Sequence, residues 1–246
     1  MHNEPAFTKT GELRGHAAMG LKHFEALGAV SVSKHIGLHG SMYTAGTRRI
    51  SGEAGINLFA SVNNNKYVSL AAGFSNGFII GKYNWELSKL EGGGKAEIRT
   101  DSRFNGFYLQ PSYYQFIDPE KRSKFSLGTK ISLVKFSHYD NTVLITPEKN
   151  PFFIVKYRGT PKMTLFAPFM QFNRVSEDGA FELTVLTGFN VIKGFSPDKI
   201  EMPDNYPDQT LVTPYTLRDK PYLNNRVGYS LIFFNISLGI RLDLLQ

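Results

Sequence analysis

The sequence predicts an all-β fold, a closed antiparallel transmembrane β-barrel of about ten strands, and two observations lead to this prediction. Apolar and polar residues alternate along much of the chain, most clearly at residues 232–244, where every even-numbered residue is apolar. Short polar connections also alternate with longer ones. Period-two alternation is typical of a strand with one apolar face, and alternating short and long connections are typical of membrane barrels.

Ten stretches have strand character, although those at residues 25–33, 104–117 and 161–175 alternate less cleanly than the others. In chain order, the predicted strands cover residues 12–19, 25–33, 35–42, 53–62, 68–75, 104–117, 124–133, 161–175, 181–190 and 232–244. The chain has no apolar stripe of helical period and no run of about 18 apolar residues, so neither a helical domain nor a transmembrane helix is expected.

The connections predict the topology. The short ones lie at residues 33–35, 63–66, 118–123 and 176–179, and the long ones lie around 45–49, 84–103, 141–160 and 196–225. In outer-membrane barrels the short turns face the periplasm and the long loops face outside. We therefore expect a single barrel domain over residues 1–246, with residues 1–10 as a periplasmic N-terminal segment.

The composition of the polar face indicates whether the apolar face of the strands points into a core or outward to lipid. A soluble β-barrel also alternates, but its outer polar face is usually rich in Lys and Glu. Here the polar face is mainly Gly, Ser, Thr and Asn. Small polar side chains suit the crowded lumen of a narrow barrel, so we expect the apolar face to contact lipid and the lumen to be largely filled.

Positive charge predominates. The chain carries 28 Lys and Arg against 21 Asp and Glu, a net charge of +7. Much of it falls in or beside the predicted outer loops, so we expect Arg48, Arg49, Arg103 and Arg158 to face lipopolysaccharide phosphates. The alternative is that charges simply collect in loops. No Gly-rich phosphate loop and no RNA-binding aromatic signature is present, so a nucleic-acid partner is not expected.

The first 45 residues contain the stretch NEPAFTKTGELRGHAAMG and the hairpin ALGAVSVSKHIGLHGSMY. They resemble outer-membrane barrel proteins of the Bacteroidota. Many of those are lipoproteins with an Asn-x-Pro-x-x-Thr-x-x-Gly-Glu stretch soon after the lipidated cysteine, which Asn3, Pro5, Thr8, Gly11 and Glu12 match. The chain has no cysteine, so the lipidation that the resemblance implies needs a residue upstream.

No export signal is visible, because the first residues, MHNEPAFTKTGEL, are polar and lack an apolar core. The predicted location, integral in a bacterial outer membrane, therefore assumes an export signal that this sequence does not contain.

The stretch FSHYDN supplies the only weak catalytic candidates. Ser137, His138 and Asp140 offer the hydroxyl, imidazole and carboxylate of a hydrolase near the outer end of a predicted strand. The ten-strand count also resembles that of outer-membrane aspartyl-type proteases, which use Asp and His at the rim. However, alternation places His138 and Asp140 on one face of the strand and Ser137 on the other. Ordinary polar rim residues are the alternative interpretation.

An ion-pair cluster is expected where the barrel closes. Glu12 and Arg14 lie on the polar face of the first strand, and Arg241 and Asp243 lie on that of the last. The two strands must pair to close the ring, so these four side chains are predicted to fill the periplasmic end of the lumen.

Neither a metal nor a cofactor is expected. His16 and His39 fall on polar faces, where hydrogen-bonded histidines are more common than metal ligands. The acidic loop SPDKIEMPDNYPDQ lacks the ligand spacing of a calcium loop.

These features predict a non-enzymatic outer-membrane barrel that serves as a structural or accessory subunit of an outer-membrane protein assembly. Its expected partners are membrane lipids, lipopolysaccharide and one or more proteins, with the loops at 141–160 and 196–225 as contact surfaces. The alternatives are an outer-membrane hydrolase with a rim active site for lipid or peptide, a narrow solute channel, and a soluble ligand-binding barrel.

Overall fold

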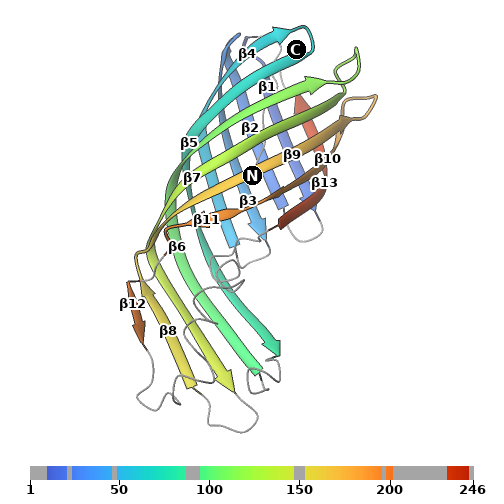
Figure 1. Cartoon of the computed structure of the whole chain (residues 1–246). Coiled ribbons are helices and arrows are strands. Elements are labelled where there is room, and N and C mark those ends of the chain that lie inside the picture. Colours follow the sequence, from blue (N-terminus) through green and yellow to red (C-terminus); the bar gives the residue numbers. More distant parts are fainter. Residues whose placement is uncertain are drawn as a thin grey trace.

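The computed structural model of the chain is all-β (Figure 1). It describes residues 10–20, 24–45, 49–86, 95–146, 153–195, 198–201 and 232–243. Its strands are β1 (Leu13–Gly20), β2 (Phe24–Ser33), β3 (Ile36–Ala45), β4 (Arg49–Asn63), β5 (Lys66–Glu86), β6 (Lys95–Phe116), β7 (Ser123–Thr146), β8 (Phe153–Gly159), β9 (Lys162–Val175), β10 (Phe181–Phe189), β11 (Val191–Lys193), β12 (Lys199–Glu201) and β13 (Ile232–Asp243). No helix among the described residues is long and apolar enough to cross a membrane.

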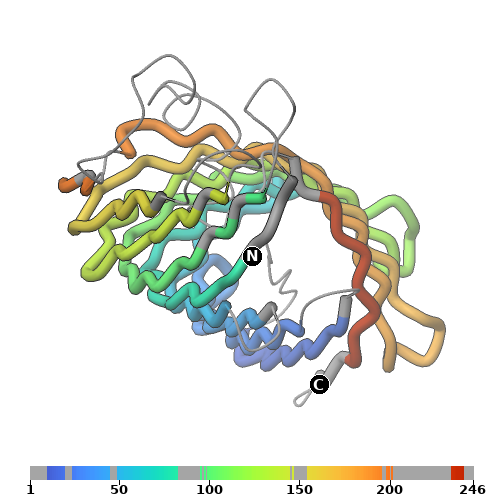
Figure 2. Tube along the Cα trace, turned by 90° about the horizontal axis from the view of Figure 1, so that it is seen from below, coloured from blue at the N-terminus to red at the C-terminus, as the bar shows by residue number. Residues whose placement is uncertain are grey.

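Ten of these strands form a closed antiparallel ring, as the sequence predicts. Strands β1 to β7 follow one another around the wall, β7 pairs with β9, β9 with β10, and β10 with β13. The ring closes where β13 pairs with β1, from Arg14 opposite Asp243 to Gly20 opposite Ser237. Figure 2 shows the ring from below, with β13 in red beside β1 in blue.

The other three strands continue the walls of the barrel. β8 and β9 pair in succession with β7, separated only by Thr160 and Pro161. In the same way, β10 and β11 pair in succession with β9. β12 pairs with β8 at the edge of the sheet. The C-terminal part of β5, the N-terminal part of β6 and the C-terminal part of β7, together with β8 and β12, therefore form a sheet that projects beyond the barrel, at the lower end of Figure 1.

Two of the predicted long loops are wrong, because the strands extend into the projecting sheet. β5 runs on to Glu86 and β6 starts at Lys95, so most of 84–103 is strand. β7 reaches Thr146 and β8 starts at Phe153, so 141–160 is also mainly strand. The apolar alternation stops there because the outward face becomes charged, while the backbone ladder continues. The predicted loop at 196–225 contains β12, and its remainder lies largely outside the described residues.

The predicted short turns are present at the opposite end, at residues 34–35, 64–65, 117–122 and 176–180. The longest is closed by Asp118, whose carboxylate accepts hydrogen bonds from the backbone N–H of Arg122 at 2.7 Å and of Ser123 at 2.6 Å. Lys121 in the same turn adopts a φ of 57°. These local bonds replace the ladder where β6 passes into β7.

The distribution of side chains is inverted relative to a soluble barrel. Large apolar side chains such as Phe74, Phe107 and Leu133 point outward and are 63%, 59% and 59% exposed. The buried side of the same wall carries small polar groups, and these include Ser31, Asn57, Ser69, Ser112, Ser126, Gln171, Asn173, Thr184 and Ser237. The apolar faces of the predicted strands therefore point away from the lumen.

The outward apolar surface forms a belt. On β7 it runs from Phe125 to Leu133, interrupted by Thr129. At about 3.4 Å per residue and a tilt of about 40°, this segment spans roughly 20–25 Å along the barrel axis, close to the apolar band of a membrane barrel. Charged residues limit the belt at both ends of β9, Lys162 at one end and Arg174 at the other.

Aromatic side chains inside the barrel lie over glycines. A Cβ added to Gly73 would lie 2.2 Å from the carbonyl oxygen of Ala54 and 2.8 Å from the hydroxyl of Tyr108. A Cβ on Gly55 would lie 2.7 Å from the same hydroxyl. The glycines of β4 and β5 thus provide the space into which the Tyr108 side chain extends, and they let the two backbones approach each other.

We expect Gly73→Ala to lower the free energy of unfolding by about 1–3 kcal/mol, because the new methyl group overpacks the wall. Urea unfolding in detergent micelles measures the effect. Gly28→Ala is the matched control, because a Cβ at that outward position meets nothing within 4 Å. Equal midpoints for the two variants would contradict the proposed steric role of Gly73.

Candidate functional site

An ion pair crosses the middle of the lumen. Lys130 Nζ of β7 donates to Glu53 Oε1 of β4 at 2.5 Å, and the side chains are 7% and 16% exposed. The same ammonium lies 4.4 Å from the ring centroid of Tyr108 on β6. Burial of either charge alone would be strongly unfavourable, so the two residues depend on each other.

A second polar contact lies beside this pair. His39 Nε2 of β3 and the hydroxyl of Tyr108 are 2.5 Å apart. The space next to them, lined by residues that include Leu27, Ser41 and Gln110, has a volume of about 10 Å³. This is room for about one water molecule. The contacts among His39, Tyr108, Glu53 and Lys130 therefore connect β3, β4, β6 and β7 across the lumen.

An apolar cluster lies where the projecting sheet leaves the ring. Phe136, Tyr139, Val143 and Val155 are buried there, and Phe195 packs against them. Phe195 contacts the rings of Phe136 and Tyr139 edge-on, with centroids 5.9 and 5.2 Å away. This cluster also fixes the projecting sheet to the rim, because Tyr139, Val143 and Val155 belong to that sheet.

The predicted cluster at the closure of the ring is described only in part. Arg14 Nε donates to Glu12 Oε1 at 2.5 Å. In the β1–β13 register Arg14 lies opposite Asp243, and His16 lies opposite Arg241. The side chains of Arg241 and Asp243 lie outside the described residues, so their participation stays a prediction.

The structure does not assemble the catalytic candidates. Ser137 forms a β-bulge, because Arg103 pairs with His138 while Phe104 pairs with Phe136. The bulge leaves Ser137 exposed like His138, whereas simple alternation placed it on the opposite face. The Ser137 hydroxyl donates to the Arg103 carbonyl at 3.4 Å. Within the described part of the chain, no hydrogen bond joins any two of the three candidates.

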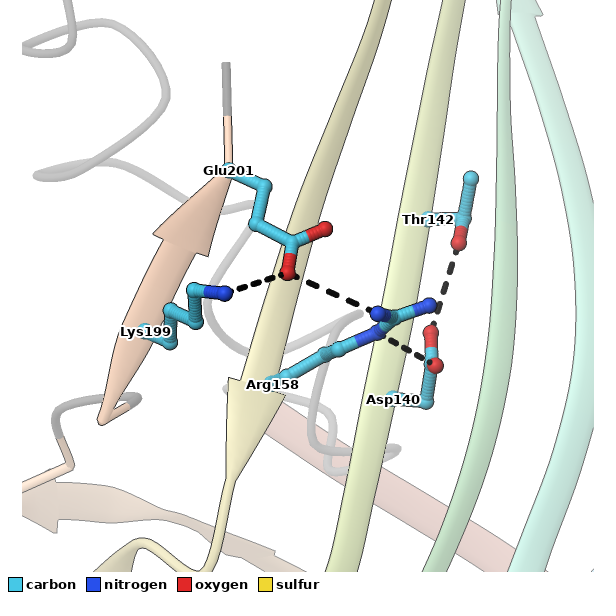
Figure 3. Close-up of polar contacts among 5 residues, drawn as sticks. All are labelled: Asp140, Thr142, Arg158, Lys199 and Glu201. Atoms are coloured by element: carbon cyan, nitrogen blue, oxygen red, sulfur yellow. Dashed lines mark hydrogen bonds and ion pairs between the residues drawn. The ribbon is translucent and has the colours of Figure 1, made fainter.

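Asp140 belongs instead to a charged network on the outward face of the projecting sheet (Figure 3). Arg158 Nε lies 3.0 Å from Asp140 Oδ2, and Arg158 Nη1 lies 3.5 Å from Glu201 Oε1. Lys199 Nζ lies 2.9 Å from Glu201 Oε1, and the Thr142 hydroxyl lies 3.3 Å from Asp140 Oδ1. The network crosses β7, β8 and β12 and balances two acids with two bases.

Asp198 attaches the start of β12 to the break between β8 and β9. Its carboxylate accepts hydrogen bonds from the Thr160 backbone N–H at 2.6 Å and the Thr160 hydroxyl at 3.2 Å. Gly159 adopts a φ of +140°, and a Cβ there would overlap Asp198. Pro161 follows and has no N–H to donate, so the break occurs where the ladder loses a donor.

The four arginines expected to face lipopolysaccharide have different surroundings. Arg48 lies outside the described residues. Arg49 lies 5.6 Å from the ring centroid of Tyr43 on the inner face, which is not the expected outward position, because odd-numbered residues of β4 point inward. Arg158 is held in the network by Asp140 and Glu201. Arg103 is exposed on the outward face of β6, and its contact with lipopolysaccharide stays a prediction.

Sequence reasoning missed the central lumen contacts. Glu53, Lys130 and His39 all lie on the polar faces of predicted strands, but nothing in the sequence indicates which of ten strands face each other across the lumen. Among the described residues, no group of three or more His, Asp or Glu side chains could hold a metal ion.

Comparisons with protein-family models, with curated proteins and with solved structures find no match to this chain.

Replacing Lys130 by Met should lower the free energy of unfolding by about 3–5 kcal/mol, because it leaves the buried Glu53 carboxylate without its cation. The double variant Glu53→Gln/Lys130→Met should recover much of the loss. Unfolding in detergent micelles for both single variants and the double variant gives the coupling energy. Additive losses would show that the two side chains do not depend on each other.

The charged network should respond to acid. The hydrogen bond from Lys199 lowers the pKa of Glu201 below its ordinary value of 4.5, and Arg158 acts in the same direction. The ion pairs of Glu201 are therefore complete above pH 4.5 and are lost as the pH falls through the lowered pKa. Lys199→Met should raise the pKa of Glu201, measured by NMR of its carboxyl carbon, and Lys193→Met should not. An unchanged titration in Lys199→Met would contradict this assignment.

Proposed function

We propose that this protein is an integral barrel of a bacterial outer membrane and acts as a non-enzymatic structural or accessory subunit of an outer-membrane protein assembly. The observation that carries the proposal is a closed barrel with an apolar outer belt, polar and charged side chains that cross its lumen, and a charged sheet that projects beyond it. The resemblance of the first 45 residues to Bacteroidota outer-membrane barrels is consistent with this proposal.

The belt supports the membrane location. Monomeric soluble proteins rarely expose contiguous apolar patches of more than a few hundred Å², yet Phe74, Phe107, Phe234 and Leu238 are all more than half exposed on the outer wall. A closed ring leaves no unpaired strand edge along the barrel wall, which is the condition for crossing lipid with strands. By the topology of such barrels, the short turns face the periplasm and the projecting sheet faces outside.

The side chains that cross the lumen favour a role other than conduction. The Glu53–Lys130 pair and the Tyr108 side chain occupy one level of the interior, and the apolar cluster around Phe136 occupies another. A solute would have to displace these groups. The arrangement of Ser137, His138 and Asp140 likewise gives no support to a hydrolase, since each interacts with other groups or with solvent.

The projecting sheet is the surface best suited to a protein partner. The charged network and the Asp198 contacts hold it in a defined shape, so its binding would require little ordering of the chain. A groove of about 370 Å³ lies on it, lined by residues that include Ile80, Lys82, Asp101 and Thr142. Exposed charges of both signs around an apolar floor resemble the polar rim and apolar centre of transient interfaces.

Single cysteines test the proposal directly, because the chain has none of its own. A cysteine at Thr142 lies in the groove, and a cysteine at Lys34 lies in a short turn at the opposite end. We expect a thiol-reactive crosslinker in native membranes to give one discrete adduct from Thr142→Cys and none from Lys34→Cys. The same preparation should need detergent for extraction and migrate faster on a gel when unboiled.

Three results would contradict the proposal. Solubility without detergent would remove the membrane location, and ion conductance in planar bilayers would support the channel alternative. A protein that is extracted as a monomer and forms no adduct from Thr142→Cys would remove the role as a subunit.

A further inference from the structure

We propose that the outward wall of the barrel binds the phosphate group of a membrane lipid between Arg103, Lys135 and Lys162. These residues lie on β6, β7 and β9, just beyond the belt on the side of the projecting sheet. The inference rests on the proposed membrane location and adds a ligand and a site to it.

Two lysines face each other across adjacent strands. Lys135 of β7 and Lys162 of β9 form the last residue pair of the β7–β9 ladder, and both side chains are exposed on the outward face. Directly opposed side chains have Cβ atoms about 5 Å apart, and like charges at this spacing repel each other. An anion between the two ammonium groups would replace this repulsion by two attractive contacts.

Arg103 and polar neighbours extend the site onto β6. Lys135 also lies opposite Asn105, whose side chain is exposed on the same face. Arg103 precedes Asn105 by two residues on β6 and lies opposite His138, which the bulge at Ser137 holds outward. A guanidinium can bind two phosphate oxygens at once, and an amide adds a further donor. The three strands therefore present donors of different types around one area of the wall.

Among the described residues, Arg103, Lys135 and Lys162 form no ion pair. The nearest acids on this face are Asp101 and Asp140, which are opposite each other one row farther from the belt. Asp140 is already paired with Arg158. The site therefore keeps a net positive charge.

The two borders of the belt differ in charge. The border at the short turns mixes signs, and Arg122 there lies 3.0 Å from Glu120. The border at the projecting sheet carries the cluster of Arg103, Lys135 and Lys162. Three cations on neighbouring strands at one border are suited to a leaflet with anionic headgroups on that side.

The occupant is a lipid because the cations adjoin apolar surface. Leu133 precedes Lys135 by two residues on the outward face, and Phe107 lies opposite Leu133. Both are 59% exposed. A headgroup phosphate at the lysines would therefore place its acyl chains along this apolar surface, about 7 Å below at the rise of a strand. A free phosphate would make no use of that surface.

The test compares Lys135→Gln/Lys162→Gln with wild-type protein in dodecyl maltoside micelles. Native mass spectrometry measures retention of phosphatidic acid and of phosphatidylcholine with identical acyl chains. We expect the wild type to bind phosphatidic acid at least tenfold more tightly than the double variant does. The control Lys34→Gln/Arg174→Gln removes the same charge at the opposite end and should bind like the wild type.

A second measurement separates this site from general charge attraction. Without anionic lipid, Lys135→Gln should raise the thermal unfolding midpoint, because it removes the repulsion from Lys162. With phosphatidic acid, the wild type should gain more stability than the variant does. The variant should therefore be more stable than the wild type without the lipid, and the wild type should gain more from the lipid. Neither result is expected if Lys135 only packs against the wall.

Three outcomes would overturn the proposal. One is equal retention of phosphatidic acid by the double variant and the control, and another is equal binding of phosphatidylcholine and phosphatidic acid. The third is binding of inorganic phosphate as tight as that of phosphatidic acid, which would indicate a free-anion site. A soluble wild type would contradict the membrane location instead, so failure of the two proposals can be told apart.

Discussion

The closure of β13 on β1 is the constraint on which the rest of the structure depends. Once the ladder is closed, every strand of the ring has two neighbours, and the backbone N–H and C=O groups of the wall bond to one another. The wall then has only two faces, and the pleat sends alternate side chains to each. Apolar side chains occupy the outer face and polar side chains occupy the inner one. Closure therefore decides both that the barrel can face lipid and that polar groups must find partners in a narrow interior.

The narrow interior determines which residues can fill it. Ten strands leave little space once long side chains point inward, and two solutions appear here. Glycines at Gly55 and Gly73 make room for Tyr108, and the Glu53–Lys130 pair satisfies two charges with each other. Both depend on residues from different strands, and both lie at the same level of the lumen. The interior thus links strands that are not neighbours in the wall.

A change of surroundings occurs where the sheet leaves the ring. The bulge at Ser137 and the break at Thr160 and Pro161 lie opposite each other, and beyond them the outward face changes from apolar to charged. Lys135 and Lys162, which have no carboxylate partner among the described residues, lie at this transition, whereas paired charges such as Arg158 lie farther out. Along the outward face, the apolar belt is therefore followed first by these cations and then by the paired network.

The sequence alone determined the all-β class, the ten strands, their short turns and the face that each strand turns outward. The strands follow from the period-two pattern, the turns from short polar connections, and the outward face from the small polar residues on the opposite face. It did not reveal the extensions of β5, β6 and β7 or the strands β8, β11 and β12, because there the apolar alternation stops or the segments are very short. Only the tertiary structure decided that Glu53 meets Lys130, that His39 meets Tyr108 and that Lys135 lies beside Lys162. These contacts depend on register between strands, and register is set by the bulge, the break and the closure of the whole ring rather than by any local stretch of the chain.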